Sequence, residues 1–170
     1  MVPSIWEQST FVNKGGPEIL SQMYAFEDKK GRPVCLVPEI TGLIQDVWQS
    51  SWQFEARPRR VFYVARCFRY ERPQLGRYRE FTQLGVELLG GQAPDDQNEV
   101  RELLGTLLDQ SGVSYELTLN VKRGLGYYTE DGFEAACPAL GAQKQVAGGG
   151  RYAEGVGWAI GIDRLLLALG

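Results

Sequence analysis

Two segments in which polar and apolar residues alternate, 60–70 and 79–90, constrain the fold more than any other feature of the sequence. Side chains of a β-strand point alternately to opposite faces, so this period of two predicts two long strands. The segment between them contains Pro73 and Gly76 and is typical of a polar loop. If the strands pair antiparallel through this loop, Arg69 lies beside one face of the second strand.

Strand-like segments also dominate the rest of the chain. Residues 23–27 and 33–37 flank a turn that ends at Gly31, and three further candidate strands are 115–121, 125–129 and 133–136. Helical spacing of apolar residues predicts a helix after Glu39, one from Pro94 buried through Val100, Leu103, Leu104, Leu107 and Leu108, and one over about 157–169. Because βαβ alternation is rare, we expect an α+β fold, with a mainly antiparallel β-sheet flanked by helices in one compact domain over residues 1–170.

Histidine is absent from the 170 residues, and this excludes several kinds of chemistry. Catalysis cannot use a Ser-His triad or an imidazole base, so it must use carboxylates, guanidinium groups, backbone dipoles or a bound metal. The cysteines, Cys35, Cys67 and Cys137, lie far apart, which indicates neither a disulfide framework nor a zinc site. The first 16 residues lack the apolar region of a secretory signal and no window is long enough for a membrane span, so we expect a cytoplasmic protein without a membrane partner.

Charge is distributed unevenly along the chain. Eight arginines and one acid, Glu71, lie between residues 57 and 79, so this window carries +7 and the remainder −10. All eight cations are arginine, whose planar fork suits phosphate and carboxylate groups. A solvated basic edge is the alternative, and it is the favoured interpretation for Arg57, Arg59 and Arg60.

The second alternating segment predicts a functional face. Its even positions from 84 to 88 are apolar and are expected to face the core, whereas the odd positions are Arg79, Phe81, Gln83, Gly85 and Glu87. With Arg69 alongside, this face offers an anion-binding group, a flat ring and polar partners for a cation or donor. Gly85 has no side chain, so another group could approach the backbone of the strand closely at this position. A solvent-exposed polar face of an antiparallel sheet is the alternative.

The C-terminal segment points to the same surface. Gly157, Gly161 and Arg164 would share one face of the expected last helix, which would bring Arg164 to the site. Close packing of helix on sheet explains the two glycines equally well, but it does not explain Arg164. No P-loop or dinucleotide-binding motif occurs in the sequence, so Rossmann and P-loop folds are disfavoured.

Four short sequence motifs occur one after another along the chain and can be compared as a set with known families. Residues 66–87 (RCFRYERPQLGRYREFTQLGVE), 123–129 (RGLGYYT), 148–152 (GGGRY) and 157–164 (GWAIGIDR) follow one another along the chain. They resemble motif 2, the R-G-L-D-Y-Y segment, the glycine-rich pocket wall and motif 3 of histidyl-tRNA synthetases, which are class II aminoacyl-tRNA synthetases. Residues 23–28 and 38–41 resemble that family's M-Y-x-F-x-D and R-P-E-G-T. The resemblance implies a class II catalytic domain and an ATP-dependent histidine–tRNA ligase.

The resemblance also implies a role for each matched residue. Arg69 would bind the α-phosphate of ATP and the substrate carboxylate, and Arg123 would act as an electrostatic catalyst beside them. The other ATP-binding residues would be Glu71 and Phe81 at adenine and Arg77 and Arg164 at the β- and γ-phosphates. The other amino-acid-binding residues would be Glu39, Thr41 and Gln83 at the α-amino group, and Glu87 and Tyr128 at the imidazole. Tyr127 and the segment from Gly148 to Tyr152 would support the imidazole site. Mg²⁺ would bridge the phosphates, and no side chain is expected to act as a metal ligand.

The chain departs from the family pattern at a few positions. Val37 and Ile40 replace the Arg and Gly of R-P-E-G-T, Gly126 replaces the acid of R-G-L-D-Y-Y, and Asp163 replaces a motif 3 Glu. We expect the chain to lack most of the motif 1 helix, the insertion between motif 2 and Arg123, and the anticodon-binding domain. Homodimerisation and tRNA charging are therefore left open.

Three functional interpretations remain in competition. The favoured one is a compact core that binds ATP and histidine and forms histidyl-adenylate, with the tRNA acceptor end as an open further partner. The second is a non-catalytic, histidine-sensing subunit resembling the regulatory subunit of ATP phosphoribosyltransferase. The third is a ligase for another amino acid or a carrier protein. A general nucleic-acid-binding module is least favoured, because the chain is acidic overall.

Overall fold

Two β-sheets and five α-helices form the part of the chain that the computed structural model describes, residues 2–141 and 143–170. The larger sheet contains β4 (Arg59–Phe68), β5 (Glu80–Leu89), β6 (Glu116–Val121), β7 (Gly132–Ala136), β8 (Gln145–Tyr152) and β9 (Gly155–Gly161). Its strand order is β4-β5-β9-β8-β7-β6, and every neighbouring pair is antiparallel. The predicted antiparallel sheet is therefore confirmed.

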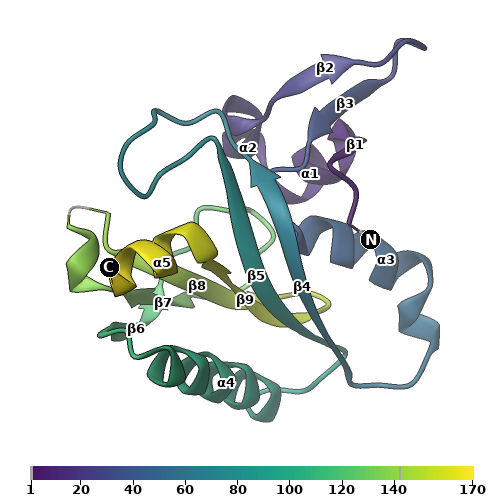
Figure 1. Ribbon diagram of the computed structural model, residues 1–170. Helices are drawn as coiled ribbons and strands as arrows, with labels where there is room; N and C mark the ends of the chain where they lie inside the picture. The colour runs from purple at the N-terminus through teal and green to yellow at the C-terminus, as the bar shows by residue number, and fades with distance from the viewer. Residues whose placement is uncertain (1, 142) are drawn as a thin grey trace.

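Helices pack on both faces of the large sheet (Figure 1). The helices are α1 (Gln8–Gly15), α2 (Pro17–Gln22), α3 (Thr41–Ser50), α4 (Asp95–Ser111) and α5 (Ile162–Leu169), with short 3₁₀ turns η1 (Trp52–Phe54) and η2 (Pro138–Leu140). One buried cluster joins α1 and α3 to the sheet, and a second joins α4 and α5 to its opposite face. None of the helices in the described part of the chain has the length and apolar character needed to cross a membrane.

A second, smaller sheet packs against α1. It contains β1 (Ile5–Glu7), β2 (Ala25–Glu27) and β3 (Pro33–Leu36) in the order β1-β3-β2. The predicted hairpin between β2 and β3 is confirmed, and Gly31 adopts the positive φ of 73° that its turn requires. Val37 follows β3 and accepts a hydrogen bond from the Phe68 N–H at 2.9 Å, which ties this sheet to the end of β4.

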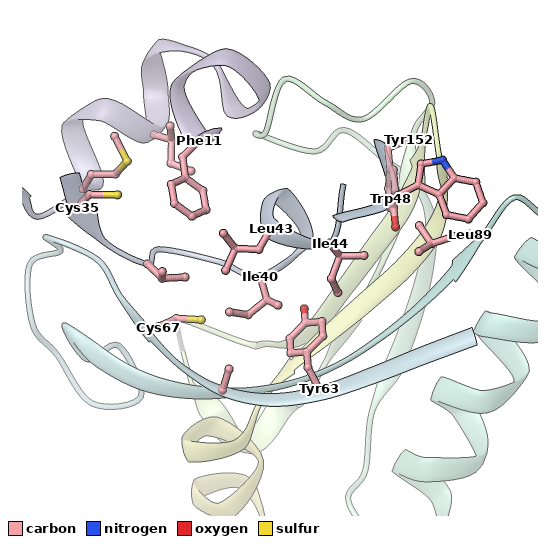
Figure 2. Close-up of a cluster of buried hydrophobic side chains, with 14 residues drawn as sticks. Phe11, Cys35, Ile40, Leu43, Ile44, Trp48, Tyr63, Cys67, Leu89 and Tyr152 are labelled. Carbon is pink, nitrogen blue, oxygen red and sulfur yellow. The ribbon is translucent and has the colours of Figure 1, made fainter. Parts of the chain in front are cut away.

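The predicted pairing of the two alternating segments is confirmed. The β4–β5 ladder runs from Arg59 opposite Leu89 to Phe68 opposite Glu80, and the Arg69 N–H continues it by donating to the Arg79 carbonyl at 2.9 Å. Tyr63 and Cys67 point from β4 toward Ile40 and its neighbours in the first core cluster (Figure 2). On the opposite face of the same strand, Phe62 is 77% exposed and Val64 is 62% exposed.

The expected helix over 157–169 is wrong in its first half, because Gly157 to Gly161 belong to β9 and only Ile162–Leu169 is helical. Glycine is a poor helix former, and here its lack of a side chain permits close strand pairing. A Cβ atom on Gly155 would lie 2.2 Å from the Leu88 carbonyl oxygen, and one on Gly157 only 1.7 Å from Glu87 Oε2. Tertiary pairing with β5 therefore overrides the helical spacing.

The expected strand over 125–129 is also wrong. This segment is a loop whose only ladder contact among the described residues is an isolated bridge between Tyr128 and Tyr152. The Gly126 N–H donates to the Gly15 carbonyl at 3.2 Å, so the loop is held against the end of α1. This contact turns the tyrosines toward the sheet face instead of adding them to its edge.

Helix α4 begins at the expected position but buries a narrower stripe. Val100, Leu104 and Leu108 are at most 1% exposed, whereas Leu103 is 45% exposed, which corrects its assignment to the core. The predicted apolar stripe of α4 is therefore slightly wider than the part of the helix that packs against the sheet. Trp158 of β9 closes this contact by donating from Nε1 to the Val100 carbonyl at 2.6 Å.

The two adjacent leucines of α4 give a test of this packing. Leu104→Ala should lower the free energy of unfolding by about 2–5 kcal/mol, because it leaves a cavity in the second core cluster. Leu103→Ala, with the same chemical change on the solvent side, should cost less than about 1 kcal/mol. Urea unfolding followed by circular dichroism measures both values, and equal losses would contradict the observed orientation of α4.

Candidate functional site

Two adjoining cavities lie over the middle of the large sheet. The first, of about 230 Å³, is lined by the 71–78 loop, β5, β8, β9 and the start of α5. The second, of about 290 Å³, is lined by the start of α3, β5, the 123–128 loop, β8 and β9. Both cavities share a wall made of Arg69, Glu71, Gln83, Gln145 and Ala159. A ligand with two parts joined by a short link fits such an arrangement.

Arg69 lies on the shared wall, one residue beyond the end of β4. Its Nε donates to the Pro38 carbonyl at 3.0 Å, and its guanidinium carbon lies 5.3 Å from the centre of the Phe81 ring. These contacts use one N–H and one face of the guanidinium group. The remaining N–H groups make no hydrogen bond to the described residues, so they are available to a ligand in either cavity.

The first cavity has a cationic wall. Arg77 pairs with Glu71, and Arg164 donates to the Gln143 carbonyl. Burial, with the neighbouring Arg77, lowers the pKa of Arg164. An anion bound between these two arginines would offset both the burial of the Arg164 charge and its repulsion by Arg77. Arg164 reaches the cavity from the first turn of α5, not from the face of a longer helix.

Glu87 is the most buried carboxylate of the second cavity, with 1% of its surface exposed. Thr41 Oγ1 donates to Glu87 Oε1 at 2.7 Å, and the Tyr152 hydroxyl donates to Oε2 at 2.8 Å. Burial raises the pKa of Glu87 to about 8, although these two hydrogen bonds favour the charged form. A cation or N–H donor that enters the cavity would compensate this buried carboxylate.

A second acid, Glu39, lies at the start of α3. It accepts hydrogen bonds from the Gly42 N–H at 2.9 and 3.2 Å and from the Tyr127 hydroxyl at 3.4 Å. Burial raises the pKa of Glu39 as well, against the opposing effects of the Gly42 N–H and Arg69. Two acids of raised pKa on one cavity are typical of a site that receives a positively charged group.

Two tyrosines and an arginine complete the second cavity. The rings of Tyr127 and Tyr128 lie 4.6 Å apart, and the Arg123 guanidinium carbon lies 5.7 Å from the Tyr128 ring. Arg123 Nη1 is 3.4 Å from Glu134, while its Nε is buried without a partner in the described part of the protein. This incomplete pairing leaves Arg123 able to bind an anion.

The structure gathers onto the walls of these cavities every residue to which the family resemblance gives a role. They are Arg69, Glu71, Arg77, Phe81, Arg164, Glu39, Thr41, Gln83, Glu87, Arg123, Tyr127 and Tyr128. What each of them binds stays a prediction. Sequence reasoning missed Tyr63 and Gln145 and gave Tyr152 only a supporting place. Only the glycine-rich motif around Tyr152 carried a usable signal.

Other arginines of the window from 57 to 79 make ion pairs or ring contacts outside the two cavities. Arg59, Arg60 and Arg66 form ion pairs with Glu55, Glu99 and Glu80, respectively. The prediction that Arg79 belongs to the functional face is wrong, because its guanidinium group lies 4.6 Å from the centre of the Tyr70 ring and lines neither cavity. Of the three arginines expected on a solvated basic edge, Arg57 and Arg60 are exposed, whereas Arg59 is half-buried against Trp52.

The comparison with known proteins identifies the family. The family model described as histidyl-tRNA synthetase matches residues 1–121, more than half of the chain. The chain belongs to the histidyl-tRNA synthetase family. It is also 28% identical to the histidine–tRNA ligase of Methanosphaerula palustris over 272 aligned positions, which cover 99% of this chain and 66% of that protein.

The relative is larger than this member of the family. An alignment of 272 positions exceeds the 170 residues of this chain by 102, so the Methanosphaerula protein carries internal segments that this chain lacks. The chain spans 66% of that relative's length. The activity of the whole relative is therefore a proposal for this chain.

Solved structures support the class II fold of this family member. Histidyl-tRNA synthetase from S. aureus superimposes with a TM-score of 0.81 at 26% identity, covering 99% of this chain and 59% of that one. A Bacillus halodurans protein titled ATP phosphoribosyltransferase regulatory subunit/histidyl-tRNA synthetase gives a TM-score of 0.84 at 18% identity, covering 100% and 73%. At that identity the second match speaks for the fold alone.

The raised pKa of Glu87 predicts a dependence of stability on pH. The pKa of a glutamate in an unfolded chain is about 4.3 and that of Glu87 in the folded protein is about 8, so between these values the folded protein holds one proton more than the unfolded chain. The stabilisation from protonated Glu87 is full below pH about 4.3 and is lost as the pH rises through about 8.

Glu87→Gln isolates this effect, because glutamine keeps the shape of the side chain without titrating. We expect the melting temperature of the wild type to fall relative to that of Glu87→Gln as the pH rises from 5 to 8.5. Calorimetric scans in ligand-free buffers measure the difference. A constant difference across this range would contradict the assignment of a raised pKa to Glu87.

Proposed function

We propose that the chain binds ATP in the first cavity and histidine in the second, and joins them as histidyl-adenylate. The observation that carries this proposal is the shared wall at Arg69. One guanidinium group can contact both the α-phosphate and the amino-acid carboxylate only if it lies between their binding sites. The family membership supports the same reaction.

The reaction requires position and charge stabilisation more than proton transfer. A carboxylate oxygen of histidine attacks the α-phosphorus of ATP, a new P–O bond forms, and the bond to pyrophosphate breaks. The nucleophile is already ionised, so no general base is needed and the absence of histidine from the chain is no obstacle. Arg69 and Arg123 would stabilise the charge that develops on the phosphoryl oxygens.

On the nucleotide side, the ring of Phe81 offers a flat surface for adenine, and Glu71 an acceptor for its amino group. Arg77 and Arg164 would hold the β- and γ-phosphates. The described residues contain no group of three or more acids or cysteines arranged to hold a metal by themselves. ATP would enter as its magnesium complex, and Asp163 on the cavity wall is the carboxylate that would fit an ion held mainly by phosphate oxygens.

On the amino-acid side, the buried acids match the charges of histidine. Glu39, Thr41 and Gln83 would receive the α-ammonium group, and Glu87 with Tyr128 would bind the imidazole. The hydroxyl groups of Thr41 and Tyr152 hold the Glu87 carboxylate in place before the ligand arrives. This arrangement orients an N–H donor of the ring without a large rearrangement of the protein.

A histidine-sensing regulatory role is the second candidate. The fold it shares with the Bacillus halodurans protein, whose title names such a subunit, is the observation that favours it. Retention of Arg69, Arg77, Arg123 and Arg164 on the cavity walls favours catalysis, because a sensor of histidine alone does not need a triphosphate site. Charging of tRNA, a homodimeric state and a cytoplasmic location are separate proposals that rest on the family membership alone.

Amino-acid-dependent exchange of pyrophosphate into ATP tests adenylate formation without tRNA. Across a panel of amino acids, we expect exchange with histidine, and Arg69→Ala or Arg123→Ala should reduce the rate by at least about 100-fold. Arg66→Ala is the matched control, since Arg66 pairs with Glu80 on the surface outside the cavities. Histidine binding in calorimetry without any exchange would overturn the catalytic proposal in favour of the sensor.

A further inference from the structure

A bulge in β8 turns one glutamine onto the site face of the sheet. Ala135 of β7 pairs with Ala147, but Ala136 pairs with Gln145, so Val146 is an extra residue in β8. Residues 145 and 148 would point to opposite faces of a regular strand. Here a Cβ on Gly148 would lie 2.6 Å from Gln145 Nε2, so both residues share one face. Bulges that re-aim a side chain in this way are frequent beside active sites.

Gln145 and Arg123 direct hydrogen-bond donors to the same place. The same point above Gly148 lies 2.5 and 2.8 Å from the two terminal nitrogens of Arg123. Arg123 only donates, and its nearest recorded acceptor is Glu134 at 3.4 Å. The Gln145 carboxamide makes no hydrogen bond to any residue that the structure describes. Two facing donor groups with no acceptor between them fit an oxyanion of a ligand.

The place of Gln145 narrows the identity of that oxyanion. Gln145 lines both cavities, whereas Arg123 lines only the second. The β- and γ-phosphates would lie deeper in the first cavity, at Arg77 and Arg164, and the imidazole deeper in the second, at Glu87. The histidine carboxylate and the α-phosphoryl group meet at the junction, and once they are joined in the adenylate only the non-bridging oxygens of the phosphoryl group still carry a charge.

We propose that Gln145 is a further substrate-contacting residue whose carboxamide N–H donates to a non-bridging oxygen of the α-phosphoryl group. This inference rests on the proposed function of the site. Gln145 would add a neutral donor to the charges of Arg69 and Arg123. A hydrogen-bond donor carried on the sheet beside the phosphoryl group would stabilise the charge that develops on its oxygens during the reaction.

Histidinol-adenylate, a stable phosphodiester that resembles the adenylate, separates this proposal from the proposed function. Calorimetry should show Gln145→Ala binding it about tenfold more weakly than the wild type, which corresponds to the loss of one hydrogen bond to a charged group. Binding of histidine alone should change by less than about twofold. Gln145→Glu should bind histidinol-adenylate more weakly still, because a carboxylate repels the phosphodiester.

The matched control is Gln110→Ala, which removes the same side chain from an exposed position of α4. It should leave all these values unchanged. Equal melting temperatures of Gln145→Ala and the wild type would exclude a loss of folding. In the exchange assay, Gln145→Ala should lower kcat by about 100-fold and leave the KM for histidine unchanged.

The outcomes are distinguishable. If the wild type binds histidinol-adenylate through Gln145 but exchanges no pyrophosphate, the catalytic function fails and the assignment of Gln145 stands. If Gln145→Ala binds histidinol-adenylate as tightly as the wild type, the assignment is overturned whatever the activity. Failure of the wild type to bind histidinol-adenylate would overturn both.

Discussion

The ten-residue ladder between β4 and β5 determines where the side chains of the site can lie. Its register places Phe81 opposite Cys67 and Glu87 opposite Val61. The ladder ends at Phe68, so Arg69 is the first residue after it. A shift by one residue would move every one of these side chains to the other face of the sheet. Pairing of β5 with β9 on its other edge makes such a shift costly, because both ladders would have to break.

Glycines let this sheet hold large polar groups against its backbone. A Cβ on Gly85 would lie 2.1 Å from the ring of Tyr63, and one on Gly157 would overlap the Glu87 carboxylate. The space expected above Gly85 is therefore filled by a side chain of the neighbouring strand, not by a ligand. These close contacts hold Glu87 in a buried position where water cannot compensate its charge, and this burial is the source of its raised pKa.

Local pattern was sufficient for part of this structure. Alternation predicted β4 and β5, and helical spacing predicted α3 and α4, because each of these elements has one buried face along its whole length. The glycine-rich stretch from 148 to 161 has weak preferences for any structure, so its two strands arise from tertiary pairing with β5 and β7. The bulge at Val146 depends on the register of a neighbouring strand, and no local feature of the sequence predicted that Gln145 faces the site.

The resemblance to the family's motifs identified residues that lie together in the structure. Alternation of polar and apolar residues alone could not distinguish a binding face from an exposed polar face of the sheet. Glu39 and Arg123 are 84 positions apart in the chain, and alternation or helical spacing carries no information about such a distance. Both residues line the second cavity, although the segment that carries Arg123 is a loop. The matched motifs therefore constrained the positions of side chains better than they constrained secondary structure.

The central claim is that one guanidinium group, that of Arg69, serves two adjoining binding sites. A crystal structure of the chain with histidine and a non-hydrolysable ATP analogue tests it most directly. We expect the α-phosphate and the histidine carboxylate within hydrogen-bond distance of Arg69, with the imidazole against Glu87. A nucleotide bound away from Arg69, or an imidazole outside the second cavity, would contradict the account.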